Sequence, residues 1–104
     1  MRIFFYGLFM DAEILKEQGL TPSEATPSFV NGYGLRIGER ALLVPSPNEL
    51  SYGVTFTLNE PEVVSLYSEP SVEDYSPFEL TVFPISGGSE ERACCYNLSA
   101  SKTK

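Results

Sequence analysis

The residue best suited to acid–base chemistry is Glu69, in the segment VVSLYSEP. It falls at the C-terminal end of a predicted helix, where the carbonyl groups carry partial negative charge and disfavour an acid by about 1 kcal/mol or less. A carboxylate in that field, if also partly buried, has a raised pKa and can accept and return a proton near neutral pH. The alternative is that Glu69 is a solvated surface acid, like most of the 14 acidic residues of this chain.

A second candidate site is the segment Tyr6-Gly7-Leu8-Phe9, between a predicted strand and a predicted helix. Successive backbone N–H groups at such a junction can bind an anion. Gly7 lets a ligand approach the main chain because glycine has no Cβ atom. The side chains of Leu8 and Phe9 can then anchor the loop in the core. The alternative is that Gly7 is only a turn residue.

The chain contains no histidine. This excludes a Ser-His-Asp triad, a Cys-His pair and histidine-ligated metals. Any catalysis must use carboxylate, tyrosine, lysine, thiol or backbone groups. Cys94 and Cys95 are adjacent, so on a strand they point to opposite faces and form neither a good disulfide nor a metal site. We therefore expect two free thiols and no metal.

The composition indicates a globular protein of one domain, with 104 residues, 42% apolar and 20% charged. A formal net charge of −7 argues against non-specific binding to nucleic acid. No apolar run reaches membrane-spanning length, and no basic and apolar leader precedes the first strand. We expect a cytoplasmic protein that binds neither nucleic acid nor membrane.

The hydrophobic pattern predicts two short helices among about six strands. Asp11 and Asn59 are good helix N-caps, and Glu62, three residues after Asn59, completes a capping box. Prolines predict loops over residues 20–28 and after Val44. The fold class is therefore α+β, a small mixed, mostly antiparallel β-barrel with two short flanking helices. Strands are predicted over 2–6, 32–37, 41–44, 52–58, 78–83 and 92–98, and helices over 12–18 and from Asn59 to before Pro70.

Taken together, these segments resemble the γ-glutamylcyclotransferase-like family. The family's Tyr-Gly-Ser-Leu motif reads here as Tyr6-Gly7-Leu8-Phe9. Its helix with a Leu-Asp-x-x-Glu-Gly pattern reads as Leu66-Tyr67-Ser68-Glu69-Pro70, with one intervening residue in place of two. Leu8, Tyr67 and Pro70 depart from the usual residues. The likeness predicts one such domain over residues 1–98 and a flexible tail over 99–104. The other matching positions are Gly32, Tyr33, Leu35, Gly53, Val54, Phe56 and Tyr75.

The resemblance implies an intramolecular reaction, in which the α-amine of a γ-glutamyl compound attacks its own γ-carbonyl to give 5-oxoproline. It implies that Glu69 is the general acid and base, and that the amides of Gly7, Leu8 and Phe9 bind the substrate. Tyr6 and Tyr75 would line the pocket, and no metal or organic cofactor is needed.

Two alternatives to the enzyme stay open. The first is an inactive module of the same fold that binds a small γ-glutamyl or carboxylate ligand. The second is a protein-interaction role for the acidic surface. The sequence predicts neither the leaving group of the substrate nor the oligomeric state.

Overall fold

The computed structural model describes residues 1–37, 41–68 and 75–97. Glu69 and Pro70, the predicted turn at Gly38 and the predicted C-terminal tail lie outside the described residues. The described elements are β1 (Arg2–Phe5), the 3-10 helix η1 (Gly7–Met10), α1 (Ala12–Glu17), β2 (Ser23–Ile37), β3 (Ala41–Thr57), α2 (Glu60–Leu66), β4 (Ser76–Pro84) and β5 (Glu91–Asn97).

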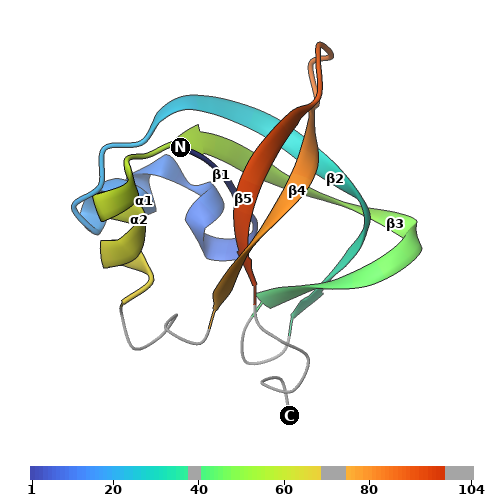
Figure 1. Cartoon of the computed structure of the whole chain (residues 1–104), viewed down its shortest axis with the longest axis horizontal. Helices are drawn as coiled ribbons and strands as arrows, with labels where there is room; N and C mark the ends of the chain where they lie inside the picture. Colours follow the sequence, from blue (N-terminus) through green and yellow to red (C-terminus); the bar gives the residue numbers. More distant parts are fainter. Residues whose placement is uncertain (38–40, 69–74, 98–104) are drawn as a thin grey trace.

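The described strands form one closed barrel in the order β1-β3-β2-β4-β5 (Figure 1). Neighbouring strands are antiparallel, except that β1 and β5 run parallel where the barrel closes. Both α-helices lie on the same side of the barrel (Figure 1). This arrangement confirms the predicted mixed, mostly antiparallel barrel with two short flanking helices.

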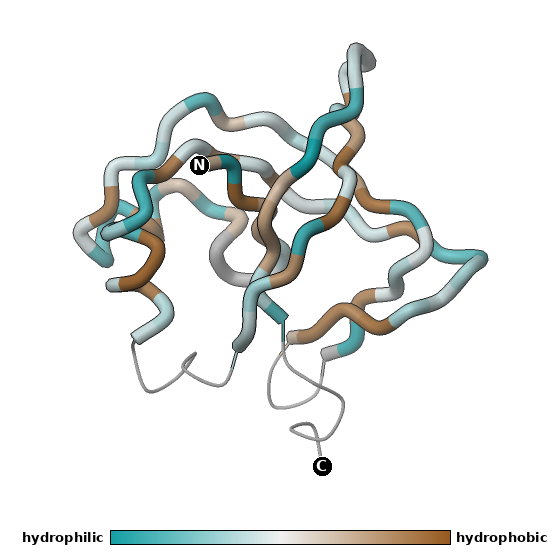
Figure 2. Tube along the Cα trace, viewed as in Figure 1, coloured by the Kyte–Doolittle hydropathy of each residue, from teal (hydrophilic) through white to brown (hydrophobic). Residues whose placement is uncertain are grey.

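Alternate residues of β1 supply two separate hydrophobic clusters, as expected for a strand with both faces buried. Ile3 and Phe5 face the helices, where they pack with Leu15 of α1 and Leu66 of α2. Figure 2 shows hydrophobic residues on α2 and along β1, where this cluster lies. The opposite face points into the barrel, where the second cluster comprises Phe4, Tyr6, Val30, Leu43, Leu80, Val82, Ala93 and Cys95.

Both predicted helix starts are confirmed. The side chain of Asp11 accepts a hydrogen bond from the backbone N–H of Glu13 at the start of α1. Asn59 and Glu62 form the predicted capping box at the start of α2, because each side chain accepts from the other residue's backbone N–H. After α1, Gly19 takes a φ of +87°, a conformation that glycine adopts more readily than other residues.

The predicted strand boundaries between residues 20 and 52 are wrong. The predicted loop over 20–28 contains the start of β2, and the predicted strands 41–44 and 52–58 are parts of the continuous strand β3. The prolines suggested loops because proline cannot donate a hydrogen bond to a neighbouring strand. Pro45 is nevertheless paired with Tyr33, next to a shift of register between Asn31 and Tyr33, where the β2–β3 ladder is already irregular.

Candidate functional site

The predicted site residues that the structure describes converge on one end of the barrel. At this end β2 and β5 finish and β3 and β4 begin, at the bottom of the view in Figure 1. Tyr6 and η1 follow β1, and Tyr75 directly precedes β4. The sixth predicted residue, Glu69, lies outside the described residues.

Tyr6 is a buried residue of the barrel interior, with 8% of its surface exposed. Its hydroxyl group donates to protein acceptors at the end of β5, 2.7 Å from Oδ1 of Asn97 and 3.0 Å from the carbonyl oxygen of Tyr96. Burial raises the pKa of the Tyr6 hydroxyl, and the nearby Cys95 thiol raises it further. Tyr6 therefore stays neutral and fixes the main chain just before Gly7.

Gly7 begins η1 in a left-handed conformation with a φ of +71°. A Cβ atom at this position would lie 3.3 Å from Cβ of Ala41, the first residue of β3. The hydroxyl group of Tyr75 donates to the carbonyl oxygen of the same Ala41, at 2.6 Å. Ala41 thus brings Gly7 and Tyr75, two of the predicted site residues, to the same place.

The N–H groups of η1 are not equivalent. In a 3-10 helix each N–H bonds to the carbonyl oxygen three residues earlier, so the first N–H groups have no acceptor inside the helix. In η1 these first groups belong to Gly7 and Leu8. The 3-10 geometry therefore favours the amides of Gly7 and Leu8 over that of Phe9 as donors to a ligand.

Tyr67, the C-cap residue of α2, holds the end of that helix against β5. Its ring stacks on the ring of Tyr96 with a centroid separation of 3.9 Å and an interplanar angle of 8°. The ring of Tyr75 is 6.3 Å away, at 43°. Burial raises the pKa of the Tyr67 hydroxyl, with smaller contributions from Cys95 and Tyr6. We call Tyr6, Tyr67, Tyr75 and Tyr96 the tyrosine cluster.

The tyrosine cluster joins the end of α2 to the start of η1. The ring of Tyr67 lies 6.3 Å from that of Tyr75, whose hydroxyl group donates to Ala41, the residue beside Gly7, so the ends of the two elements are close. The cluster is apolar over most of its area and carries neutral hydroxyl groups. Its partly exposed rings, those of Tyr67, Tyr75 and Tyr96, can pack against a small organic ligand, while the backbone amides of η1 supply polar contacts.

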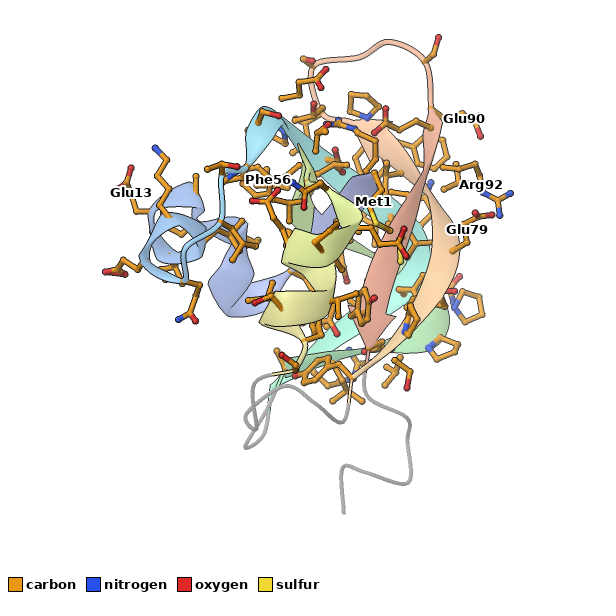
Figure 3. The ribbon with its side chains drawn as sticks, turned by 60° about the vertical axis from the view of Figure 1, so that its left-hand side comes forward. Met1, Glu13, Phe56, Glu79, Glu90 and Arg92 are labelled. Atoms are coloured by element: carbon orange, nitrogen blue, oxygen red, sulfur yellow. The ribbon has the colours of Figure 1, made fainter. Side chains whose placement is uncertain are left out.

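Cationic side chains in the described part of the chain are engaged in ion pairs. Arg2 pairs with Glu91, Lys16 with Glu13, Arg36 with Glu49 and Arg92 with Glu79. Figure 3 shows Glu79 and Arg92 beside one another on the outer surface. Because these four cationic side chains already have acidic partners, a carboxylate ligand at the tyrosine cluster would, among the described residues, be bound by neutral donors instead.

Two further observations concern metals and membranes. Within the described ranges, no group of three potential metal-ligating side chains is close enough to hold an ion. None of the helices described there is long and apolar enough to cross a membrane.

Both cysteines are free thiols, Cys95 buried and Cys94 partly exposed, as predicted for neighbours on a strand.

Sequence reasoning missed Ala41, Tyr96 and Asn97 at this end of the barrel. A signal existed only for Asn97, because Ala93 and Cys95 both point into the barrel. A residue two positions after Cys95 falls on the same face of the strand. An asparagine there is an inward polar group that needs partners, whereas Ala41 carries no comparable signal.

Comparison with known proteins supports the fold. No family model and no curated protein matches the sequence. Among solved structures, a protein from Arabidopsis thaliana gives a TM-score of 0.82 at 16% identity, over 99% of this chain and 70% of its own. A gamma-glutamyl cyclotransferase gives 0.75 at 18% identity, over 94% and 66%. An uncharacterized protein from Homo sapiens gives 0.77 at 18% identity, over 94% and 66%.

These likenesses identify the architecture as the γ-glutamylcyclotransferase-like fold, which confirms the fold expected from the sequence. One of the solved proteins that share it is a gamma-glutamyl cyclotransferase. This chain spans 66% to 70% of the length of the three solved chains.

Proposed function

We propose that this protein is an enzyme that cyclises a γ-glutamyl amine, amide or peptide to 5-oxoproline and releases the amine. The observation that carries the proposal is that Tyr67 at the end of α2 contacts Tyr75, which is bonded to Ala41 beside Gly7, in a fold shared with a gamma-glutamyl cyclotransferase. Glu69 is two positions after Tyr67 in the sequence. Chain connectivity therefore limits its distance from Tyr67 to about 7.6 Å between Cα atoms.

The proposed reaction needs no protein nucleophile. The α-amine nitrogen of the substrate attacks the γ-carbonyl carbon, a new C–N bond closes the five-membered ring, and the C–N bond to the leaving amine breaks. Both reacting groups belong to one molecule, so the enzyme gains most by holding the folded conformation of the substrate. Glu69 takes one proton from the α-ammonium group and gives it to the leaving nitrogen. The second proton that the ring nitrogen loses also goes to the leaving amine, which departs as an ammonium ion.

The amides of Gly7 and Leu8 bind the negative charge of the substrate in this mechanism. They either hold its α-carboxylate or polarise the γ-carbonyl, whose oxygen gains charge as the ring closes. In well-studied enzymes the loss of one such donor costs about 3 to 4 kcal/mol. Leu8 lacks the hydroxyl group usual at its position in the family but still supplies its N–H. Phe9, also predicted to donate, would add a weaker contact.

Tyr6 and Tyr75 act as supports and walls in this proposal. Both hydroxyl groups donate to protein oxygens, Tyr6 at the end of β5 and Tyr75 at Ala41. The ring of Tyr6 is packed in the barrel interior, so Tyr6 is the support, and the partly exposed ring of Tyr75 is the wall that packs against the substrate in this proposal. We also propose a cytoplasmic location, where the free thiols of Cys94 and Cys95 would stay reduced.

A second candidate function is binding without turnover. It is favoured by Tyr67, which stands where the family usually has an aspartate and is committed to a stack on Tyr96. A module of this kind would hold a γ-glutamyl compound at the same amides. It would gain thermal stability from the ligand but release no product.

The deciding experiment measures 5-oxoproline release from a panel of γ-glutamyl compounds with four different leaving groups: an amino acid, a peptide, a lysine side chain and a simple amine. We expect release from at least one compound and a loss of roughly a hundredfold or more in kcat for Glu69→Gln. Glu73→Gln, an acid from the same part of the sequence, is the control and should keep its activity.

Two results would overturn the proposal. Full activity in a folded Glu69→Gln variant would show that another group moves the proton. Thermal stabilisation by γ-glutamyl compounds with no product from any of them would favour the binding module.

A further inference from the structure

We infer that Asn97 is a positioning residue that fixes the turn of η1, and this inference rests on the proposed function. Oδ1 of Asn97 accepts from the backbone N–H of Leu43, at 2.9 Å, and from the hydroxyl group of Tyr6, at 2.7 Å. Nδ2 donates to the carbonyl oxygen of Leu43, at 2.8 Å. The side chain of Asn97 thus connects the end of β5 to Leu43, near the start of β3, and to Tyr6, the residue before Gly7.

This connection is not part of the regular strand pairing. In the barrel, β5 neighbours β4 and β1, whereas β3 neighbours β1 and β2. Asn97 therefore joins two strands that share no backbone ladder, and it does so at the end where η1 begins. Its side-chain amide mimics a peptide group, because it presents an acceptor to the N–H of Leu43 and a donor to the carbonyl oxygen of Leu43.

Asparagine is the side chain that these partners require. Leu43 presents a donor and an acceptor, so both an amide oxygen and an amide nitrogen are needed at position 97. An aspartate would face the carbonyl oxygen of Leu43 with an acceptor, and a leucine would leave the N–H of Leu43 and the hydroxyl group of Tyr6 without this partner. Buried polar groups without partners are costly.

The hydrogen bonds of Asn97 restrict the main chain at Gly7 through the side chain of Tyr6. That ring is packed in the barrel interior, and Asn97 and Tyr96 hold its hydroxyl group, so the main chain at position 6 has little freedom. The peptide groups that follow belong to Gly7 and Leu8, the proposed donors. A shift of about 1 Å in such groups is enough to reduce a rate by roughly a hundredfold.

The test compares Asn97→Leu, Tyr6→Phe and the double variant with the native protein. Ser51→Ala is the matched control, because it also removes a buried side-chain hydrogen bond, from Ser51 Oγ to the carbonyl oxygen of Tyr33, but on the β2–β3 pair. Two quantities are measured, the amide chemical shifts of Gly7 and Leu8 by NMR, and kcat and KM for 5-oxoproline release.

We expect Asn97→Leu and Tyr6→Phe to shift the Gly7 and Leu8 amide signals and to lower kcat roughly tenfold to a hundredfold, with a smaller change in KM. The double variant should lose little more than the worse single variant, because both changes break one network. Ser51→Ala should leave the Gly7 and Leu8 signals and kcat unchanged. If Asn97→Leu fails to fold, Tyr6→Phe keeps the Asn97–Leu43 bonds and decides the question.

The two amide signals also separate this inference from the proposed function. Unchanged Gly7 and Leu8 signals in folded Asn97→Leu and Tyr6→Phe variants overturn the positioning role, whatever the activity. If the native protein releases no 5-oxoproline while those signals shift, the proposed function fails but Asn97 still fixes η1.

Discussion

At the scale of single residues, Gly7 is a position that both backbone conformation and packing restrict. Its φ of +71° favours glycine, and a Cβ atom added there would make a close contact of 3.3 Å with Cβ of Ala41. Gly19 has a similar positive φ of +87° but open space around it. Substitutions at these two glycines therefore distinguish the cost of backbone strain from the cost of the contact with Ala41.

We predict that Gly7→Ala destabilises the protein more than Gly19→Ala does. Left-handed backbone costs alanine about 1 to 2 kcal/mol at either position. Only the Gly7 variant adds a close contact, and Gly7→Ala combined with Ala41→Gly should recover that part. The free energies of unfolding in urea measure the difference. An equal loss of stability in both single variants would show that Ala41 does not confine Gly7.

Single residues also explain why the sequence indicated a special position at Gly7 but not the residues that contact this turn. A glycine between a strand and a helix is a local signal, because the conformational freedom of glycine is a property of one residue. Ala41 and Asn97 contact this turn from far along the chain. Contacts of that kind leave no pattern in the sequence near position 7.

At the scale of elements, α2 is held at both ends. At its start, the carboxylate of Glu62 accepts from the backbone N–H and the hydroxyl group of Thr21 and from the backbone N–H of Asn59. At its end, Tyr67 stacks on Tyr96. The helix that precedes Glu69 is thereby fixed to the loop after α1 and to β5.

We predict that Glu62 makes stability depend on pH in the acid range. The N–H of Thr21, and then that of Asn59, lower the pKa of Glu62 in the folded protein below its ordinary value of 4.5. A lowered folded pKa stabilises the protein above the unfolded pKa, and this stabilisation is lost as pH falls through the folded value. Glu62→Gln should flatten the pH dependence of the free energy of unfolding between about pH 6 and 3.

Glu60→Gln is the control for this prediction, because it removes an acid from the same helical turn. It should leave most of the acid-range slope in place. A slope that is the same in the native protein and in Glu62→Gln would mean that the Thr21 and Asn59 bonds do not form in solution.

Like single residues, the bounds of helices and strands were predictable only where the signal is local in the sequence. Both helix starts were predictable, because a cap and its capped N–H are at most three residues apart. The extent of β2 and β3 was not, because pairing with a neighbouring strand overrides the local effect of Pro27 and Pro45.

At the scale of the whole molecule, the barrel followed from alternating hydrophobic residues on a handful of short strands. Its closure by parallel pairing of β1 with β5 brings the two ends of the described chain together, with Ile3 opposite Cys94. The same closure brings Tyr6 to Tyr96 and Asn97. The predicted convergence of Tyr6, Gly7 and Tyr75 thus depends on the fold, whereas Glu69 remains a prediction.

The most direct measurement is a crystal structure of the protein with bound 5-oxoproline. We predict a Glu69 carboxylate oxygen within about 2.6 to 3.2 Å of the ring nitrogen of the product. We also predict a product oxygen at hydrogen-bond distance from the N–H of Gly7 or Leu8. A product bound elsewhere, or a Glu69 carboxylate directed into solvent with the amides of η1 unoccupied, would contradict the account.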